Sequence, residues 1–175
     1  MTATTKLPLP PTEVPACDDL DQLAPKFRSA VNGIIGRLEA QGFAAKVAET
    51  VRTPERQKFL YGFGRDYDDD RGVVTQSESA LTSWHGFGLA VDIIHASLGW
   101  GAPVTFWQAL ARAALAEGMT SGSDWNRNSI NDEKFCDRPH VQWYCAGMHV
   151  SPSDHARQLL AQGGVEAVWR EVEAV

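Results

Sequence analysis

The chain has 175 residues, a length that suits one domain with a single hydrophobic core. Hydrophobic residues make up 43% and charged residues 22%, which is ordinary for a soluble globular protein. The net charge of -6 argues against broad electrostatic binding to nucleic acid or insertion at an anionic membrane. No apolar run approaches the roughly 20 residues of a membrane-spanning helix. Residues 1–14 lack the apolar core of a secretory signal, so we expect synthesis in the cytoplasm without a signal peptide.

The first half of the chain alternates between extended and helical patterns. Residues 1–17 are rich in threonine and proline and predict a flexible Pro-rich arm ahead of a single domain spanning residues 18–175. Apolar residues at spacings of three and four predict a first helix between residues 18 and 42. Residues 43–52 predict a strand. A threonine followed by a proline then predicts the N-cap and first position of a helix over residues 53–64.

The second half adds short strands and two more helices. Residues 65–82 predict a loop. The elements expected beyond it are a buried strand (87–94), a helix (103–118), a short strand (141–144), and a final helical region capped by Ser151 or Ser153 and broken at Gly163 and Gly164. The sum predicts an α+β domain with a small antiparallel sheet and flanking helices. No long exposed apolar stripe is evident, so we expect a monomer.

Four aspartates crowd the predicted loop at residues 66–70. Their Asp-x-Asp-x-Asp start resembles a Ca²⁺-binding loop. However, Gly72 falls one place late for such a loop, and Ser77 stands where a bidentate glutamate is needed. We therefore expect a solvated acidic loop and keep a Ca²⁺ site as the alternative.

Two short segments nearly fifty residues apart hold the residue types of a zinc site. Alternate residues of a strand share a face, so Asp92 and His95 point to opposite sides and His95 is excluded as a ligand. His85 lies in the segment leading into that strand, where it can fold over Asp92. His140 completes the set from another strand. Two histidines and one carboxylate leave a fourth position open, which is the pattern of a catalytic zinc.

Asp137 adds a second carboxylate to this group, three residues before His140. A zinc ion makes bound water acidic enough to attack an amide near neutral pH. A neighbouring carboxylate can take the proton from that water and deliver it to the leaving amine. The residues therefore predict a hydrolytic zinc site.

These segments resemble the signature of the VanY-like D-alanyl-D-alanine carboxypeptidase family of zinc peptidases. That family includes the L-alanyl-D-glutamate peptidases that serve as bacteriophage endolysins. The shared pattern is Ser-x-His-x-x-Gly-x-Ala-x-Asp followed by Asp-x-x-His, matched here by Ser83, His85, Gly88, Ala90, Asp92, Asp137 and His140. Lesser similarities extend the resemblance over residues 28–145 and include Arg52-Thr53, Gln57, Leu60-Tyr61, Gly64-Arg65, Val73-Val74-Thr75 and Asp124-Trp125-Asn126.

The resemblance implies a hedgehog/D-Ala-D-Ala peptidase-like fold and one Zn²⁺ per chain. Its ligands would be His85, Asp92 and His140, with Asp137 as the general base. The peptide stem of peptidoglycan would be the substrate.

The resemblance also implies residues that contact the substrate. Arg52 would polarise the scissile carbonyl or hold a carboxylate, and its alternative role is that of a surface arginine. Ser83 would bind substrate or hydrogen-bond the ligand loop. Gln57 would bind substrate or brace the site.

The second motif has the form Asp-x-Pro-His, which is closer to the endolysin branch than to the Glu-x-x-His form of the vancomycin-resistance dipeptidases. This implies an L-alanyl-D-glutamate endopeptidase that acts as an endolysin on the cell wall after release from the cytoplasm. The alternatives are a D-alanyl-D-alanine carboxypeptidase, a non-catalytic zinc-containing cell-wall recognition module, and a structural phage or envelope protein with a vestigial site.

Overall fold

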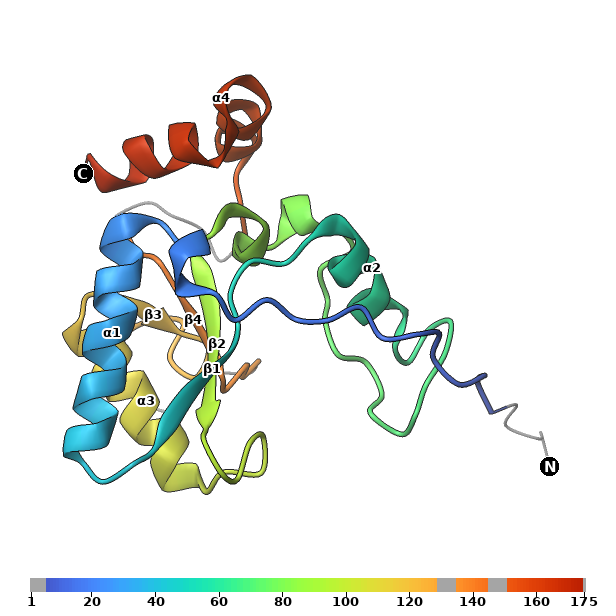
Figure 1. Cartoon of the computed structure of the whole chain (residues 1–175), viewed down its shortest axis with the longest axis horizontal. Helices are drawn as coiled ribbons and strands as arrows, with labels where there is room; N and C mark the ends of the chain where they lie inside the picture. Colours follow the sequence, from blue (N-terminus) through green and yellow to red (C-terminus); the bar gives the residue numbers. More distant parts are fainter. Residues whose placement is uncertain (1–5, 129–134, 145–150, 175) are drawn as a thin grey trace.

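The computed structural model describes residues 6–128, 135–144 and 151–174 (Figure 1). Its elements, in chain order, are η1 (Leu20–Gln22), α1 (Pro25–Ala40), β1 (Ala45–Glu49), α2 (Pro54–Gly62), η2 (Ala80–Thr82), η3 (Trp84–Phe87), β2 (Ala90–His95), α3 (Val104–Ala116), β3 (Thr120–Ser121), β4 (His140–Gln142) and α4 (Asp154–Glu173). None of the described helices is both long and apolar enough to span a membrane.

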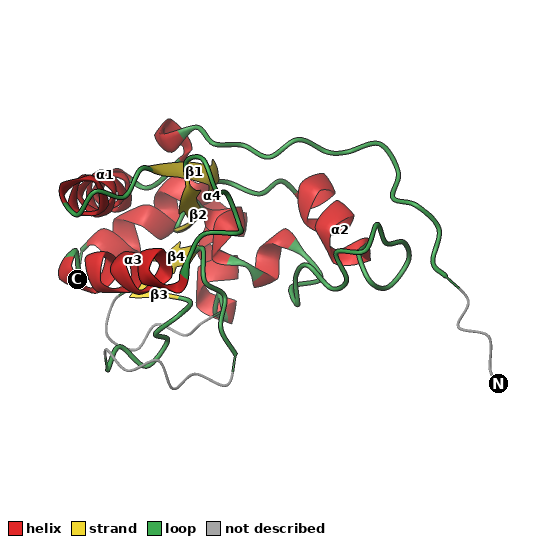
Figure 2. Ribbon diagram, turned by 90° about the horizontal axis from the view of Figure 1, so that it is seen from below, coloured by secondary structure: helices red, strands yellow, loops and turns green. Residues whose placement is uncertain are grey.

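The four strands form one antiparallel sheet in the order β1-β2-β4-β3. Helices α1 and α3 lie together on one side of this sheet, while α2 stands apart on the other side of the molecule (Figures 1 and 2). The predicted α+β class, with a small antiparallel sheet and flanking helices, is therefore confirmed.

The main hydrophobic core fills the space between the sheet and these two helices. Val91 and Ile93 of β2 are fully buried in it, together with Ile34 of α1 and Leu110 of α3. Because side chains alternate along a strand, Asp92 lies on the opposite face of β2 from Val91 and Ile93. The core thus fixes a strand whose other face is available for chemistry.

Several helix boundaries follow the predicted local signals. The hydroxyl of Thr53 accepts a hydrogen bond from the amide of Arg56 at 3.1 Å, which makes it the N-cap of α2. Ser153 caps α4 in the same way, and the predicted break in that helix occurs at Gly163 and Gly164. Gly164 has a φ of 71°, so the chain changes direction there at little steric cost.

The strand predicted at residues 87–94 begins later, at Ala90, because residues 84–87 form the 3₁₀ turn η3. Gly88 ends this turn with a φ of 65°. A β-carbon there would lie 2.7 Å from the carbonyl oxygen of Gln22, so only glycine fits. His85 consequently sits on a short helical turn instead of a loop.

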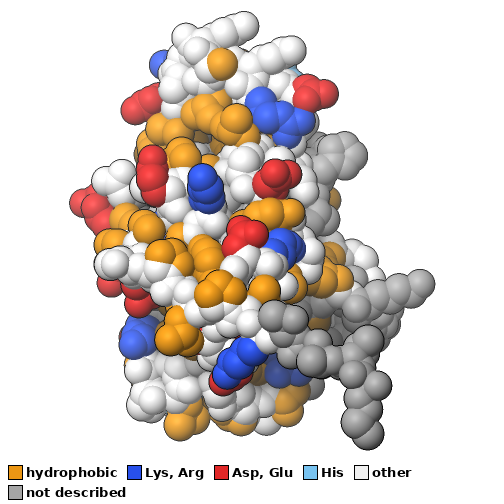
Figure 3. Space-filling model, turned by 90° about the vertical axis from the view of Figure 1, so that its right-hand side faces the viewer, with side chains coloured by type: hydrophobic (Ala, Val, Ile, Leu, Met, Phe, Trp, Pro, Cys, Tyr) orange, Lys and Arg blue, Asp and Glu red, His pale blue; other side chains and the backbone are white. Residues whose placement is uncertain are grey.

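Residues 54–82, here called the α2 lobe, have a separate small core. Phe59, Leu60 and Phe63 are buried in it, and Tyr67 packs against them. Both Phe59 and Tyr67 make edge contacts with Phe63, at 5.2 Å between ring centroids. Figure 3 shows the surface on the side of the molecule where α2 lies, and hydrophobic side chains there are interspersed with charged side chains of both signs.

The described part of the Pro-rich arm contains no helix or strand over residues 6–17 and runs along the α2 lobe (Figure 1). The carbonyl of Pro8 accepts a hydrogen bond from the amide of Asp68 at 2.9 Å. That of Val14 accepts one from Arg56 at 2.5 Å. These hydrogen bonds hold the arm against the lobe.

The acidic loop at residues 66–70 is held by contacts within the protein. Asp68 accepts a hydrogen bond from the amide of Gly72 at 2.9 Å, and Asp69 pairs with Arg71 at 2.7 Å. Asp70 is exposed and lies 3.8 Å from Lys6. Ca²⁺ binding here stays an alternative derived from the sequence alone.

Candidate metal centre

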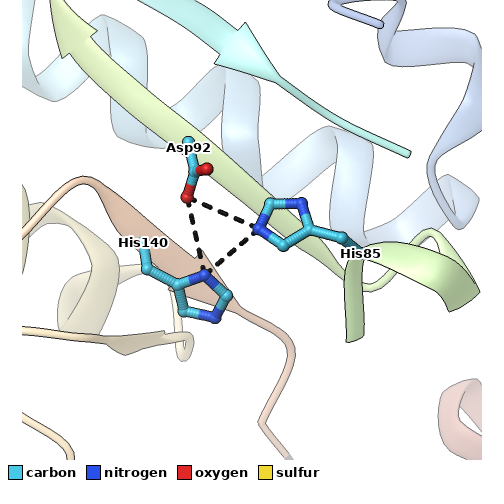
Figure 4. A group of neighbouring side chains, drawn as sticks. All are labelled: His85, Asp92 and His140. Atoms are coloured by element: carbon cyan, nitrogen blue, oxygen red, sulfur yellow. Dashed lines mark hydrogen bonds and ion pairs between the residues drawn. The ribbon is translucent and has the colours of Figure 1, made fainter. Parts of the chain in front are cut away.

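Three side chains from distant parts of the sequence converge on one point (Figure 4). Asp92 of β2 and His140 of β4 are directly opposed in the sheet, so their side chains share a face. His85 reaches the same point from η3. All three side chains are buried, with exposed fractions of 1% for His85, 7% for Asp92 and 8% for His140.

The spacing of the three donor atoms matches one face of a tetrahedral zinc site. His85 Nε2 lies 3.2 Å from His140 Nδ1 and 3.4 Å from Asp92 Oδ1. His140 Nδ1 lies 3.5 Å from the same oxygen. Tetrahedral bonds of about 2.0–2.1 Å place neighbouring ligand atoms about 3.3–3.4 Å apart, so these residues fit Zn²⁺ with a fourth position left open.

Hydrogen bonds on the far side of each imidazole select the tautomer that such a site requires. His85 Nδ1 lies 2.6 Å from the carbonyl oxygen of Thr50, which makes it the protonated nitrogen. His140 Nε2 lies 3.1 Å from Oε1 of Gln142 and donates to it. The nitrogens that face Asp92 therefore carry lone pairs. Three acceptors that meet without a proton to share are satisfied by a cation.

The electrostatics of the triad favour an ionised carboxylate. Burial alone raises the pKa of Asp92, but His85, His140 and Arg52 hold that pKa well below its usual value. Burial and the charge of Arg52 lower the pKa of His85, which keeps this ring neutral. Burial also lowers the pKa of His140, yet the nearby carboxylates of Asp92 and Asp137 outweigh it and raise that pKa overall.

The backbone places Asp137 beside this triad through two hydrogen bonds to Gly122. The amide of Asp137 donates to the carbonyl of Gly122 at 2.9 Å, and the amide of Gly122 donates to the carbonyl of His140 at 2.8 Å. A β-carbon on Gly122 would lie 2.2 Å from the carbonyl oxygen of Asp137. Glycine is therefore required for this close approach, which ties the segment of the second carboxylate to that of a metal ligand.

Asp137 is half-buried, and burial raises the pKa of its carboxyl while His140 acts in the opposite direction. Its carboxylate is not one of the three converging donors. It lies instead in the wall of a cavity that also includes two of them, His85 and His140. A second carboxylate and two members of the candidate metal-binding group thus face the same space.

The cavity has a volume of about 480 Å³. One wall belongs to the α2 lobe and consists of residues 73–77, where Val73 and Val74 are exposed. Another wall carries Trp125 and Phe135, whose rings are stacked at 14° with centroids 6.4 Å apart. Trp125 also contacts the ring of His140, with 5.5 Å between centroids. The site therefore opens between residues 73–77 of the lobe and an aromatic pair.

Arg52 lies in the cavity wall but is bonded within the protein. Its guanidinium donates to Glu49 through Nε at 2.8 Å, to Gln57 through Nη1 at 3.2 Å and to Asp92 Oδ2 through Nη2 at 3.2 Å. The side chain is only 9% exposed. It is a buried cation with two anionic partners and not the surface arginine of the alternative interpretation.

The other two candidate substrate residues lie in different surroundings. Ser83 lines the cavity next to η3. Gln57 has no exposed surface, and its amide nitrogen donates to the carbonyl of Ser77 at 2.5 Å. Gln57 thereby supports the cavity segment of the lobe from behind.

Sequence reasoning missed the hydrogen-bond and ion-pair partners of the triad and of Arg52. The backbone carbonyl of Thr50 carries no signal in a sequence, and Glu49 reads as an ordinary polar residue of a strand. Gln142 is different, because it follows His140 by two residues and therefore shares its face of β4. That spacing would have identified it as a partner for the ring of His140.

No protein-family model and no curated protein sequence matches this chain. Among solved structures, it is similar to the L-Ala D-Glu endopeptidase ChiX of Serratia marcescens, with 21% identity, a TM-score of 0.49, and coverage of 73% of this chain and 84% of that one. It is also similar to the vancomycin-resistance D,D-pentapeptidase VanY in complex with Zn(II), with 16% identity, a TM-score of 0.49, and coverage of 92% and 93%. A third is the LD-carboxypeptidase LdcB, with 14% identity, a TM-score of 0.48, and coverage of 95% and 73%. Two of these three proteins, the L-Ala D-Glu endopeptidase and VanY, bear the names of enzymes in the family that the motifs resemble.

Proposed function

We propose that this protein is a zinc-dependent peptidase that cleaves the peptide stem of peptidoglycan. The observation that carries the proposal is the triad of His85, Asp92 and His140, whose donor atoms have the spacing of a zinc site with an open position. Asp137 in the same cavity supplies the proton acceptor that a recognition module does not need.

The chain's own residues divide the chemistry between them. Zn²⁺ bound to the triad would supply a Lewis acid for the scissile carbonyl and an acidified water near neutral pH. Asp137 takes the proton of the attacking water and delivers it to the leaving amine. The hydrogen bonds that His85 donates to Thr50 and that His140 donates to Gln142 keep both rings in the orientation that this requires.

An L-alanyl-D-glutamate endopeptidase is the form of this activity that we favour. A carboxypeptidase has to bind the terminal carboxylate of its substrate, usually with a cation. In the described part of the cavity the cationic side chain is Arg52, and it is already paired with Glu49 and Asp92. An internal bond places no such demand on the site, and the Asp-x-Pro-His form of the second motif agrees with this choice.

We assign Ser83 to substrate binding, because its side chain lines the cavity, and Gln57 to support of residues 73–77. The cellular role that fits the proposal is that of an endolysin, made in the cytoplasm and active as a monomer on the cell wall after release.

Digestion of purified peptidoglycan with and without a chelator tests the proposal, with released termini identified by mass spectrometry. We expect new N-terminal D-glutamate, or its amidated form, which disappears with chelator and returns when Zn²⁺ is restored. Release of D-alanine alone would assign the protein as a carboxypeptidase. Undiminished cleavage in excess chelator would rule out a metallopeptidase. One bound zinc per chain without any cleavage would instead favour the recognition module.

A further inference from the structure

The end of strand β1 contains an irregularity that moves one acidic side chain to the metal face of the sheet. Val47 pairs with Ile93, but the next pair along is Glu49 with Asp92, so one extra residue is accommodated in β1. In an unbroken strand Glu49 would share the core-facing side with Val47. The bulge places it directly opposite Asp92 instead, and bulges of this kind commonly re-aim a side chain next to an active site.

As a result, Glu49, Asp92 and His140 form a row across three neighbouring strands. Glu49 is 5% exposed and Asp92 is 7% exposed, so two carboxylates face each other away from water. Like charges that are directly opposed in a sheet are destabilising. A buried carboxylate pair therefore needs a cation between its members.

Arg52 supplies that cation. Its Nη2 lies 2.6 Å from Glu49 Oε2 and 3.2 Å from Asp92 Oδ2, so it bridges the two carboxylates. The remaining oxygen of Glu49 accepts from Nε of Arg56 at 2.8 Å. Charges thus alternate in a buried chain that runs Arg56, Glu49, Arg52, Asp92 and ends at the metal-binding point.

This row of alternating charges determines which partner each carboxylate oxygen of Asp92 faces. Its Oδ1 faces the histidines and its Oδ2 faces Arg52. An arginine fork readily binds both oxygens of one carboxylate, which would withdraw Oδ1 from a metal. Because Glu49 also binds the guanidinium of Arg52, Arg52 contacts Asp92 through Oδ2 alone. Oδ1 of Asp92 is thereby left free for a metal.

We propose that Glu49 is a positioning residue for the metal centre, acting through Arg52 to keep Asp92 a one-oxygen ligand. The inference rests on the proposed function only in taking Zn²⁺ as the metal. It also moves Arg52 from the substrate to the support of Asp92.

The test is zinc affinity, measured by competition with a chromophoric chelator, in Glu49→Gln. We expect affinity to fall about 10–100-fold, the usual effect of losing an outer partner of a metal ligand. The visible spectrum of the Co²⁺-substituted protein should shift as well, because it reports the coordination of the metal. Glu55→Gln is the matched control, since this exposed glutamate of α2 lies outside the chain of charges.

The double variant Glu49→Gln/Arg52→Gln separates positioning from a merely structural role. If Glu49 acts by restraining Arg52, removal of both charges should restore part of the affinity lost in Glu49→Gln. A double variant that binds zinc more weakly than the single one, or a single variant with unchanged affinity and Co²⁺ spectrum, overturns the inference. Should Glu49→Gln fail to fold, Glu49→Asp keeps the negative charge on a shorter side chain that loses the 2.6 Å contact with Arg52. We expect this variant to bind zinc more weakly than the wild type, and wild-type affinity would refute the inference.

These measurements do not depend on peptidase activity. A wild-type protein that binds zinc but cleaves no peptidoglycan would refute the proposed function. The zinc affinity of Glu49→Gln would still test the role of Glu49. An active wild-type enzyme together with a Glu49→Gln variant of unchanged zinc affinity and Co²⁺ spectrum would refute this inference alone.

Discussion

The sheet and the α2 lobe both face the cavity, but they hold their residues in different ways. The sheet presents Asp92 and His140 on paired strands backed by the main core. The lobe presents residues 73–77 on a segment without regular structure, supported by side chains such as Gln57 and Arg65. A metal site needs donor atoms fixed to a fraction of an ångström, and strands provide that better than loops. Selection of substrates is a task for which an adaptable segment suffices.

The largest expected effect comes from removing a ligand on the sheet side. His140→Ala leaves two donors, so we expect loss of bound zinc and of all zinc-dependent cleavage, because the remaining donors no longer define the site. The loss in affinity should exceed the roughly 10–100-fold typical of outer partners. Metal analysis after gel filtration measures it. One zinc per chain in this variant would contradict the ligand assignment. His155→Ala, at an exposed histidine of α4, is the control.

The next effect separates chemistry from metal binding within the same wall. Asp137→Asn should keep its zinc and lose turnover by about 10²–10⁴-fold, the usual contribution of a general base. Steady-state kinetics and metal analysis on the same sample provide the two readouts. Asp70→Asn is a matched control, since Asp70 is exposed and asparagine tolerates its φ of 75°. Equal zinc loss in Asp137→Asn and His140→Ala would refute this division of roles.

A third substitution tests whether the lobe is an independent unit. Phe63 is fully buried in the small core, and its replacement by alanine should destabilise the lobe by about 3–5 kcal/mol. We expect faster hydrogen exchange within residues 54–82 and a higher KM, with zinc content unchanged.

Phe106→Ala provides the contrast to Phe63→Ala, because Phe106 is fully buried in the main core. It should increase exchange across β2 and β4 and weaken zinc binding. If both variants raised hydrogen exchange to the same extent throughout the domain, the α2 lobe would not be a unit that unfolds independently of the main core.

The smallest effect concerns pH. The pKa of His140 is raised above its ordinary value of 6.5, since Asp92 and Asp137 outweigh the effect of burial. Zinc requires the neutral ring, so protons compete more strongly as the pH falls through this raised pKa. As the pH is lowered, zinc affinity should therefore begin to fall while the pH is still above 6.5, the ordinary pKa of a histidine. In Asp137→Asn, which lacks one of the two anions, the fall should move to lower pH. A midpoint that stays in place would show that Asp137 exerts no such influence.

The sequence predicted the parts of the site that depend on local pattern. Alternation along a strand separated Asp92 from His95, and the predicted triad of His85, Asp92 and His140 is the group that converges in the structure. Helix caps such as Thr53 were visible for the same reason, because their signals span only a few residues.

What could not be predicted depends on contacts between distant segments. The extra residue in β1 that turns Glu49 toward Asp92 is defined only by pairing with β2. The two-residue strand β3 is too short to give a periodic pattern, and it exists because β4 pairs with it. Arg52 lines the cavity as expected of a substrate residue, but its pairing could not be predicted, because Asp92 lies forty residues further on and Glu49 is brought to the same face only by the bulge.

The close approach of Gly122 to Asp137 has a consequence for recognising relatives of this chain. Any side chain at that position would collide with the carbonyl of Asp137, so the fold constrains a residue that takes no part in chemistry. A glycine fifteen places before the Asp-x-x-His segment is thus a steric fingerprint, independent of the ligands themselves. Sequences that have exchanged their metal ligands but kept this backbone would still carry it, which makes Gly122 a marker of the backbone path and not of activity.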